Sequence, residues 1–435
     1  MNQNYDVIII GAGFTGLSAG LALTRAKKTV LILESDEDPG GLAGIFSFKN
    51  GIKVEKYYHH WFNNDFYVPK LVESLGLSDQ VLKLPSKTGM YYNGRLWKLS
   101  SPIDLLKFTP LKLHERLRLG WTILKIRRIK HWKLLEALSI REWLEPLCGK
   151  NAFRIIWEPL IKAKFSIFAE KVNAVWMWKK LVLRGSTRSK GGREELAYFK
   201  GGFGRLAQMM VDEIRRAGGE VLFNHKVMQA IIVENKIRSL KTARGEFSGK
   251  QYLFTPALAI VADIFEGVAE QRWINTLRRV QYLGNICLVL QLKHSLSEIY
   301  WININDPGFP FVGIIEHTNF DAPENYGNCH IVYLSRYLAK SDPVWQYNDE
   351  QYLNFALTHL KRMFPDFDVS WIIDYHIWRA DYAQPITERF YSQYVPGRET
   401  PFENAKLSTM AHIYPEDRGT NYAIREGLDV AKQLM

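Results

Sequence analysis

The stretch DVIIIGAGFTGLSAG, residues 6–20, decides the fold, together with VLILE at residues 30–34. An unbroken β-branched run at residues 7–10 leads directly into three glycines, and an Ala- and Leu-rich helical pattern follows to about Lys27. A second apolar strand then ends at Glu34. This order predicts a strand, a helix and a second strand that belong to one parallel sheet.

The three glycines have the GxGxxG spacing of a dinucleotide site. A pyrophosphate binds at a helix N-terminus, because unpaired N–H groups and the helix dipole favour negative charge there. Gly11 allows the tight turn, Gly13 lets the backbone approach the phosphates, and Gly16 permits close packing of helix on strand. Glu34 lies 18 residues after Gly16, near the spacing of roughly 20 at which an acid hydrogen-bonds a ribose hydroxyl. A carboxylate disfavours a 2′-phosphate, so we predict FAD or NAD; the alternative is a glycine turn in an ordinary α/β core.

The composition is that of a soluble globular protein with two or three connected domains. The chain has 435 residues, of which 47% are hydrophobic and 23% charged. No apolar run approaches the roughly 20 residues that span a bilayer, and a first strand at Tyr5 leaves no room for a signal peptide. Cys148, Cys287 and Cys329 are widely separated, so we expect neither a disulfide framework nor a metal site. These features predict a cytoplasmic protein.

Most of the excess positive charge lies in residues 107–133. This segment contains nine Lys and Arg against Glu115 alone, in a chain of formal net charge +12. Its apolar residues recur at steps of three or four: Leu119, Ile123, Ile126 and Ile129. Basic amphipathic helices with Trp suit an anionic membrane, where each basic group contributes roughly 1 kcal/mol. We predict peripheral binding at the inner membrane face, with a solvated helix face as the alternative. No nucleic-acid motif accompanies the segment, so we expect no nucleic-acid partner.

Three further segments have the pattern of a nucleotide-binding domain. SDEDPGGLAG, residues 35–44, places a glycine pair soon after Glu34. Residues 200–227 contain a double glycine, an amphipathic helix, a glycine turn and a strand, and YLFTP follows at residues 252–256. The C-terminal residues 407–435 contain a strand, a glycine and a helix. With the first unit, these segments resemble the FAD-dependent amine oxidase superfamily, which includes protoporphyrinogen oxidases, phytoene desaturases and, more distantly, UDP-galactopyranose mutases.

The resemblance implies an α/β fold with a Rossmann-like FAD-binding domain of the glutathione reductase type. We expect this domain to be assembled from residues 1–65, 195–265 and 400–435. A mixed α+β substrate domain then has a helical part at residues 66–194, which includes the basic segment, and a sheet part at residues 266–399.

The resemblance also implies which residues contact FAD. The implied contacts are Gly11, Gly13, Phe14, Thr15, Gly16, Glu34, Ser35, Gly40, Gly41, Leu42, Ala43, Val227, Thr255, Gly419, Thr420, Asn421, Tyr422 and Ala423. Val227 places its backbone against the adenine, and the helix that begins near Thr420 points at the flavin pyrimidine edge. Two residues depart from the family pattern: Leu42 replaces a usual Arg, and His412 follows Ala411 where Gly is usual. No cysteine follows Cys329, so we expect noncovalent FAD.

The residues expected to act on the substrate are His59, His60 and Lys164. His59 and His60 lie in KYYHHWF, which by resemblance passes beneath the isoalloxazine; packing of a domain seam is the alternative. Lys164 lies in IIWEPLIKAKF with Glu158 and Lys162, which either face the substrate or form a structural ion pair. The segment VGIIEHTNF, residues 312–320, faintly resembles a mutase segment, and its acid and histidine suit a cavity wall or strand edge better than acid–base chemistry.

These observations favour an FAD-dependent dehydrogenase or oxidase. It would transfer a hydride from an apolar or lipid-linked small-molecule substrate to flavin N5. One alternative is a redox-neutral sugar mutase, in which reduced flavin attacks a sugar carbon. A second alternative is a non-catalytic flavin-bound scaffold.

Overall fold

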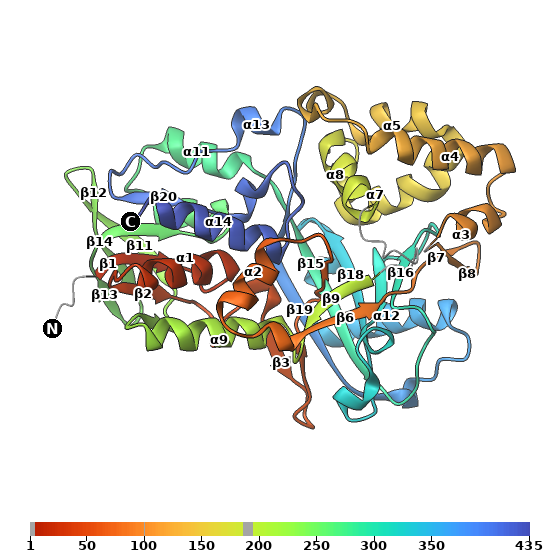
Figure 1. Cartoon of the computed structure of the whole chain (residues 1–435), viewed down its shortest axis with the longest axis horizontal. Helices are drawn as coiled ribbons and strands as arrows, with labels where there is room; N and C mark the ends of the chain where they lie inside the picture. Colours follow the sequence, from red (N-terminus) through yellow and green to blue (C-terminus); the bar gives the residue numbers. More distant parts are fainter. Residues whose placement is uncertain (1–4, 100, 186–194) are drawn as a thin grey trace.

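The computed structural model describes residues 5–99, 101–185 and 195–435, and two large sheets organise it (Figure 1). The first sheet is parallel throughout. In spatial order it contains β10 (Glu220–Leu222), β2 (Val30–Leu33), β1 (Tyr5–Ile10), β14 (Gly249–Phe254) and β20 (Ala405–Leu407). These strands come from three distant parts of the chain, which confirms the predicted Rossmann-like sheet built from discontinuous segments.

The β-branched run in β1 is unbroken because both faces of the strand are covered. Val7 and Ile9 face a helical layer, and Ile8 and Ile10 face the opposite layer. The helical layer contains α1 (Phe14–Arg25), α9 (Phe203–Arg216) and α14 (Thr420–Lys432). The opposite layer contains the antiparallel β11 (Val227–Val233), β12 (Lys236–Thr242) and β13 (Gly245–Phe247), with α10 (Leu258–Ile264) and α11 (Gln271–Arg279).

The second sheet is antiparallel except where β16 pairs with β7. In spatial order it contains β19 (Ile372–Pro385), β15 (Tyr282–Leu292), β18 (His330–Leu338), β17 (Gly313–Glu316), β16 (Trp301–Ile304), β7 (Thr88–Tyr92) and β8 (Arg95–Lys98). Helix α12 (Asp349–Met363) covers one face, against Ile286 and Leu288. In β15 and β18, Asn285 pairs with Tyr337 and Cys287 with Ser335, so these four residues share the opposite face.

A cluster of helices lies beside the second sheet, away from the first (Figure 1). It contains α3 (Pro102–Lys107), α4 (Leu113–Ile126), α5 (Ile140–Cys148), α6 (Lys150–Ala152), α7 (Glu158–Phe165) and α8 (Ala174–Gly185). Pro159 lies in the first turn of α7, where a proline is tolerated. Leu119 and Ile126 of the predicted apolar stripe in α4 are buried in this cluster. That stripe therefore packs inside the protein and is not available to a membrane.

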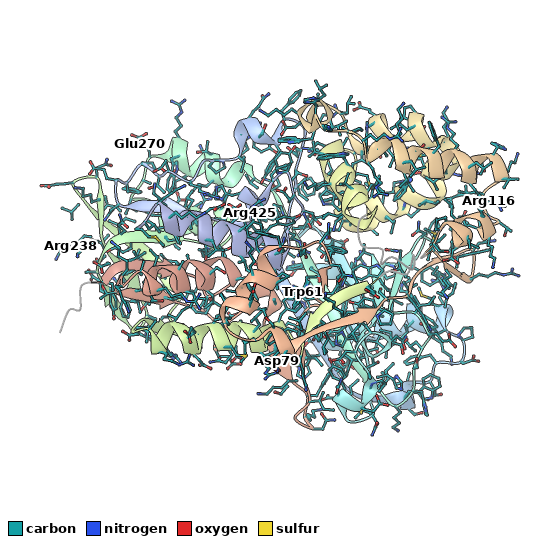
Figure 2. All side chains as sticks on the ribbon, viewed as in Figure 1. Trp61, Asp79, Arg116, Arg238, Glu270 and Arg425 are labelled. Carbon is teal, nitrogen blue, oxygen red and sulfur yellow. The ribbon has the colours of Figure 1, made fainter. Side chains whose placement is uncertain are left out.

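The segment at residues 57–62 runs between the two sheets, and Trp61 lies near the centre of the molecule (Figure 2). An antiparallel hairpin of β3 (Ile45–Ser47) and β4 (Lys53–Glu55) precedes it. The Glu55 carboxylate accepts hydrogen bonds from Tyr198 Oη (2.8 Å) and Phe203 N (2.9 Å), which ties the hairpin to the start of α9. The smaller elements nearby are β5 (Trp61–Phe62), β9 (Glu195–Phe199) and β6 (Val81–Pro85), which form one sheet, and α2 (Tyr67–Ser74).

Within the described ranges, no helix is both long enough and apolar enough to cross a bilayer.

Candidate active site

The glycine loop between β1 and α1 leaves open space at a helix N-terminus. Gly11 has φ +100°, and a Cβ there would lie 2.6 Å from Thr255 Oγ1. A Cβ on Gly16 would lie 2.0 Å from the Gly11 carbonyl oxygen, so the helix can approach the strand only without a side chain. A Cβ on Gly13 would meet nothing within 4 Å, and no side chain caps the helix at this residue. The N–H groups of the first turn therefore face a space that suits an anionic group.

Glu34 is held beside this loop at the end of β2. Its Oε2 accepts a hydrogen bond from Ala12 N (2.6 Å), and its Oε1 accepts hydrogen bonds from Ser35 Oγ and Asp36 N (both 3.0 Å). The carboxylate is almost buried, so these bonds fix its orientation. Its remaining lone pairs can accept a ribose hydroxyl.

The glycine pair follows the same loop. Gly40 N donates to Ala12 O (2.9 Å), and Gly40 forms an isolated parallel bridge with Gly13. Gly40 and Gly41 have φ +108° and +56°, a backbone conformation that favours glycine. Leu42 follows the pair and reaches the cavity described below.

A second helix N-terminus, that of α14, faces the same region. Gly419 precedes the helix without a side-chain cap, and a Cβ there would meet nothing within 4 Å. Asn421 Oδ1 accepts hydrogen bonds from Tyr67 N (2.8 Å) and Val68 N (3.2 Å), so its side chain holds α2. A Cβ on Gly427 would lie 2.2 Å from the Thr15 carbonyl oxygen, which shows how closely α14 packs on α1. Two uncapped helix N-termini, the glycine pair and Glu34 form a set of groups that fits FAD.

The remaining residues that the resemblance implied lie close to this set. Thr255 Oγ1 donates to Ile10 O (2.7 Å) at the end of β1. Phe14 is buried, with its ring 6.3 Å from that of Phe203, so it offers a cofactor only its backbone. Val227 is buried at the start of β11. The other such residues are Thr15 at the start of α1, Ser35 after β2, Ala43 in a 3₁₀ turn, and Ala423 in the first turn of α14.

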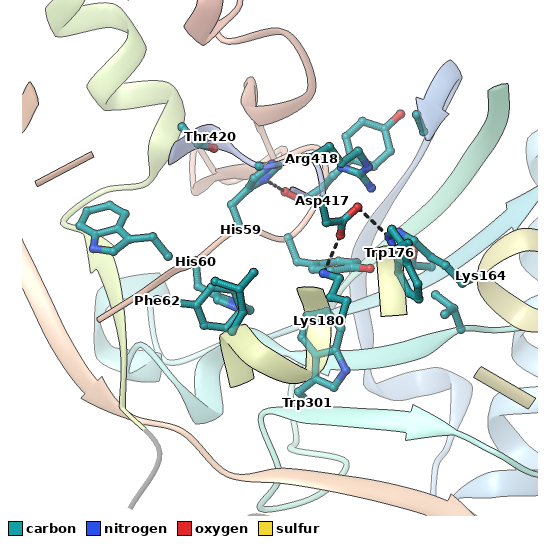
Figure 3. Close-up of a pocket in the computed structure, with 18 of the residues that line it drawn as sticks. His59, His60, Phe62, Lys164, Trp176, Lys180, Trp301, Asp417, Arg418 and Thr420 are labelled. Carbon is teal, nitrogen blue, oxygen red and sulfur yellow. Dashed lines mark hydrogen bonds and ion pairs between the residues drawn. The ribbon is translucent and has the colours of Figure 1, made fainter. Parts of the chain in front are cut away.

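A cavity of about 330 Å³ lies where residues 57–65, the helical cluster, the second sheet and the start of α14 meet (Figure 3). Aromatic and aliphatic side chains form most of its wall: Tyr57, Tyr58, Phe62, Trp157, Leu160, Trp176, Met177, Leu181, Trp301, Val312, Tyr337 and Ala383. Gly419, Thr420, Asn421 and Tyr422 form its wall on the α14 side. An apolar wall with a few convergent polar groups is typical of a ligand site.

His59, His60 and Lys164 all line this cavity. The contact of His59 Nδ1 with Tyr57 O is 2.6 Å, and burial, with the nearby charge of Arg418, lowers the pKa of His59 to about 4. His60 Nδ1 lies 2.9 Å from Tyr300 Oη. Lys164 Nζ lies 3.8 Å from the centre of the Tyr337 ring. Burial, again with the Arg418 charge, lowers the pKa of Lys164 well below its usual value.

An ion pair with a buried carboxylate lies beside Lys164. Asp417 accepts hydrogen bonds from Lys180 Nζ (2.6 Å) and Trp176 Nε1 (2.9 Å), both drawn in Figure 3. Burial by itself would raise the pKa of Asp417, but the charges of Lys180, Lys164 and Arg418 outweigh burial and lower it. Arg418 donates through Nε to Gln384 Oε1 (2.9 Å) and through Nη2 to Tyr337 Oη.

Sequence reasoning missed Asp417, Arg418 and Lys180. A signal was available for the first two, because two charged residues directly precede Gly419, which was expected at the flavin. Lys180 has no such signal, since it lies on α8 among apolar residues.

The other charged candidates lie outside the cavity wall. Glu158 binds Arg141 (2.7 Å) and Lys162 (2.8 Å), so the structural ion-pair interpretation holds for these two predicted residues. Glu316 is fully buried and accepts hydrogen bonds from Leu296 N (3.0 Å) and Ser297 N (2.9 Å), which fixes the loop after β15. His317 Nε2 lies 2.7 Å from Tyr326 Oη in the core.

Comparisons with known proteins agree with this architecture. The family model described as flavin containing amine oxidoreductase matches residues 14–435. A 15-cis-phytoene desaturase of Glycine max is 20% identical over 399 residues, covering 83% of this chain and 66% of that protein. The chain thus spans slightly less than two thirds of that relative.

Two solved structures have the same fold. The crystal structure of reduced UDP-galactopyranose mutase matches with TM-score 0.77 and 14% identity, covering 99% of this chain and 95% of the other. Cyclohexylamine oxidase from Brevibacterium oxydans IH-35A matches with TM-score 0.73 and 14% identity, covering 99% of both chains. At these identities the likeness shows the fold alone.

Proposed function

The chain belongs to the flavin containing amine oxidoreductase family, and from this premise we propose that it binds FAD noncovalently and oxidises an apolar or lipid-linked substrate. The observation that carries this proposal is the meeting of the α14 N-terminus, His59, His60 and Lys164 on the wall of one cavity.

The two helix N-termini have the chemistry to hold the cofactor. The first turn of α1, at Gly13, would bind the diphosphate, and Glu34 would accept a ribose hydroxyl. The glycine pair would pass beside the diphosphate, and the N–H groups at Thr420 would stabilise negative charge at the pyrimidine edge. Bound FAD would supply the hydride acceptor.

The cavity wall would position the substrate and exclude water. Its aromatic and aliphatic side chains suit an apolar molecule. His59, with its pKa near 4, presents a neutral imidazole at neutral pH. The groups that could take a proton are this ring, the ring of His60 and the amine Nζ of Lys164.

The cysteines support noncovalent binding. Cys148 and Cys287 are buried and Cys329 is half-buried, and none of the three lines the cavity.

We also propose that residues 1–65, 195–265 and 400–435 form the FAD-binding domain and that residues 66–194 and 266–399 form the substrate domain. All strands of the parallel sheet come from the first set of segments, which supports this division.

The test begins with the purified protein. We expect a yellow protein that releases FAD on acid denaturation, and anaerobic mixing with a turned-over apolar substrate should bleach the flavin stoichiometrically. Lys164→Met should slow this bleaching, whereas Lys162→Met, an exposed lysine on the same helix, should not. Activity that requires a reductant without consuming it would contradict the proposal and favour the sugar mutase. A flavin-bound protein that no candidate substrate bleaches would favour the scaffold.

We further propose that an anionic membrane surface is a partner. Helix α4 exposes a second apolar face, formed by Leu113, Leu117, Trp121 and Leu124, of which Trp121 is 65% exposed. Ile103 and Leu106 of α3 are also exposed, and together these six residues form the α4 patch. Eight of the nine lysines and arginines of residues 107–133 are exposed, and they lie in or next to α3 and α4 in the sequence. Arg116 marks this outer end of the helical cluster in Figure 2. A large apolar patch with basic neighbours suits an anionic lipid surface.

Co-sedimentation with phosphatidylglycerol-containing vesicles tests this partner. Leu117→Ser/Trp121→Ser and Arg127→Glu/Arg128→Glu should each reduce binding clearly. The matched control is Arg238→Glu/Lys241→Glu, because these exposed residues lie on β12 at the opposite end of the molecule (Figure 2). Equal binding by the patch variants and the control would remove the membrane from the proposal.

A further inference from the structure

Two basic side chains on the cavity wall, those of Lys164 and Arg418, form no ion pair with a carboxylate of the described residues. Lys164 Nζ lies over the Tyr337 ring, and Arg418 donates to the hydroxyl of the same tyrosine. The second hydrogen bond of Arg418 goes to the neutral amide of Gln384. Within residues 5–99, 101–185 and 195–435, no ion pair involves either side chain. Both side chains are half-buried, and both line the cavity.

The charge of Asp417 acts on both side chains from a distance, but no described carboxylate of the cavity bonds to either of them. Both oxygens of Asp417 are engaged, one by Lys180 and the other by Trp176. Asp65 accepts a hydrogen bond from Phe62 N (2.9 Å), and burial raises its pKa to about 6. The charged neighbour that influences Asp65 is again Lys180. The two carboxylates therefore bond to other groups, and the donors of Lys164 and Arg418 at Tyr337 have no carboxylate bonded to them in the described part of the chain.

A charge enclosed by an apolar wall is costly unless an opposite charge pairs with it. We propose that Arg418, Lys164 and Tyr337 form an anion subsite, which binds a carboxylate or phosphate group at one end of the substrate. The proposal rests on the proposed function in that it assumes the cavity receives the substrate. It names a property of that substrate, a negative charge, which the family does not specify.

The groups around the subsite indicate the rest of the substrate. Ser335 shares a strand face with Tyr337, and Asn285 Nδ2 donates a hydrogen bond to Ser335 Oγ (2.9 Å). The Oδ1 atom of Asn285 is buried without a hydrogen-bond partner, so it can accept a bond from a substrate hydroxyl or amide. Trp157 and Leu160 provide apolar surface on the side of the helical cluster. The substrate class that fits is an amphiphile with an apolar body and an anionic end, whereas an ammonium group would meet the like charge of Arg418.

The subsite gives Lys164 a binding role. A bound anion favours the charged form of a neighbouring amine, so it would raise the pKa of Lys164 and the amine would take up a proton. Lys164 would then donate to the anion together with Arg418, and His59 and His60 would remain as the groups able to accept the substrate proton.

Calorimetric titration of the FAD-bound protein with four C8 probes tests the inference. The probes are octanoate, octyl phosphate, octanol and octylamine. Hydrogen bonds to charged groups predict that octanoate or octyl phosphate binds about 10-fold or more tighter than octanol, and octylamine weakest. Whichever of octanoate and octyl phosphate binds more tightly shows whether the subsite prefers a carboxylate or a phosphate. Proton uptake on binding, measured in buffers of different ionisation enthalpy, should accompany the anionic probes.

Two variants locate the effect. Lys164→Met and Arg418→Gln should each lower the preference for the anion over octanol by about 10-fold, and Lys164→Met should abolish the proton uptake. Lys162→Met is the matched control and should preserve both. The inference is overturned if the wild-type protein binds octanol or octylamine as tightly as the anions, or if Lys162→Met and Lys164→Met behave alike. The wild-type comparison stands even if a variant does not fold, and a protein that binds no FAD would instead refute the proposed function.

Discussion

Gly13 directly precedes α1 and Gly16 lies in its first turn, yet alanine at each residue should have a different effect. Gly13 has φ −72° and ψ 173°, which alanine adopts without strain, and a Cβ there meets nothing within 4 Å. Replacing the N-cap glycine by alanine destabilises the folded protein by about a few tenths of a kcal/mol or more. Alanine also lowers the conformational entropy of the unfolded chain, which offsets part of this loss. We therefore expect the unfolding free energy of Gly13→Ala apoprotein to lie within about 1 kcal/mol of wild type.

The effect of Gly13→Ala should appear when FAD binds. The new methyl group would occupy the open space at the N-terminus of α1, where the diphosphate is expected. Displacing a charged group from its N–H donors costs about 1.5–3 kcal/mol, which corresponds to a loss of about 10- to 100-fold in FAD affinity. Quenching of FAD fluorescence on titration with apoprotein measures this loss.

Gly16→Ala should act on the apoprotein itself. Its Cβ would lie 2.0 Å from the Gly11 carbonyl oxygen, a backbone atom that cannot rotate away. Overpacking typically costs 1–3 kcal/mol, and we expect about 3 kcal/mol here in urea unfolding. The reasoning is refuted if Gly13→Ala binds FAD as tightly as wild type, or if Gly13→Ala destabilises the apoprotein as much as Gly16→Ala.

Three further predictions concern single side chains. Glu34→Gln should weaken FAD binding about 10-fold, measured by the same fluorescence titration, because the carboxylate is a stronger acceptor for a ribose hydroxyl than an amide. Burial raises the folded pKa of Glu316 from 4.5 to about 7. The contribution of Glu316 to the free energy of unfolding is thus fully present below about pH 4.5 and is lost as the pH rises towards 7. Over this range the free energy of unfolding of wild type, measured in urea, should fall by about 3 kcal/mol relative to that of Glu316→Gln. Parallel curves for the two proteins would contradict this. Leu119→Ala should cost about 2–5 kcal/mol and Leu117→Ala less than about 0.5 kcal/mol, since only Leu119 is buried; similar losses would mean that α4 is oriented differently.

The FAD-binding part of the fold could be predicted because its signals are local. The run at residues 7–10, the three glycines and Glu34 lie within 30 residues, and each has a steric or electrostatic reason that does not depend on distant contacts. The double glycine before α9, Gly201 and Gly202, and the final helix after Gly419 follow the same local rules. The strand order confirms the α/β architecture that these segments predict.

The orientation of α4 shows where this reasoning fails. Leu119 and Ile126 form a regular apolar stripe, but so do Leu117 and Trp121 on another face. Periodicity identifies an amphipathic helix without deciding which apolar face meets the core when both are present. The packing of α4 against α5 and α8 decides it.

The sequence by itself determined a dinucleotide-binding sheet, because turn sterics and helix-end electrostatics act over a few residues. Only the tertiary structure decided the chemistry of the cavity. Lys164, Lys180, Ser335 and Arg418 lie on two different helices, a strand and the loop before α14, up to 254 residues apart, and no local pattern relates them. Their meeting at Tyr337 and Asp417 depends on how the helical cluster packs on the second sheet, and charge balance in an enclosed space exists only once that packing has formed.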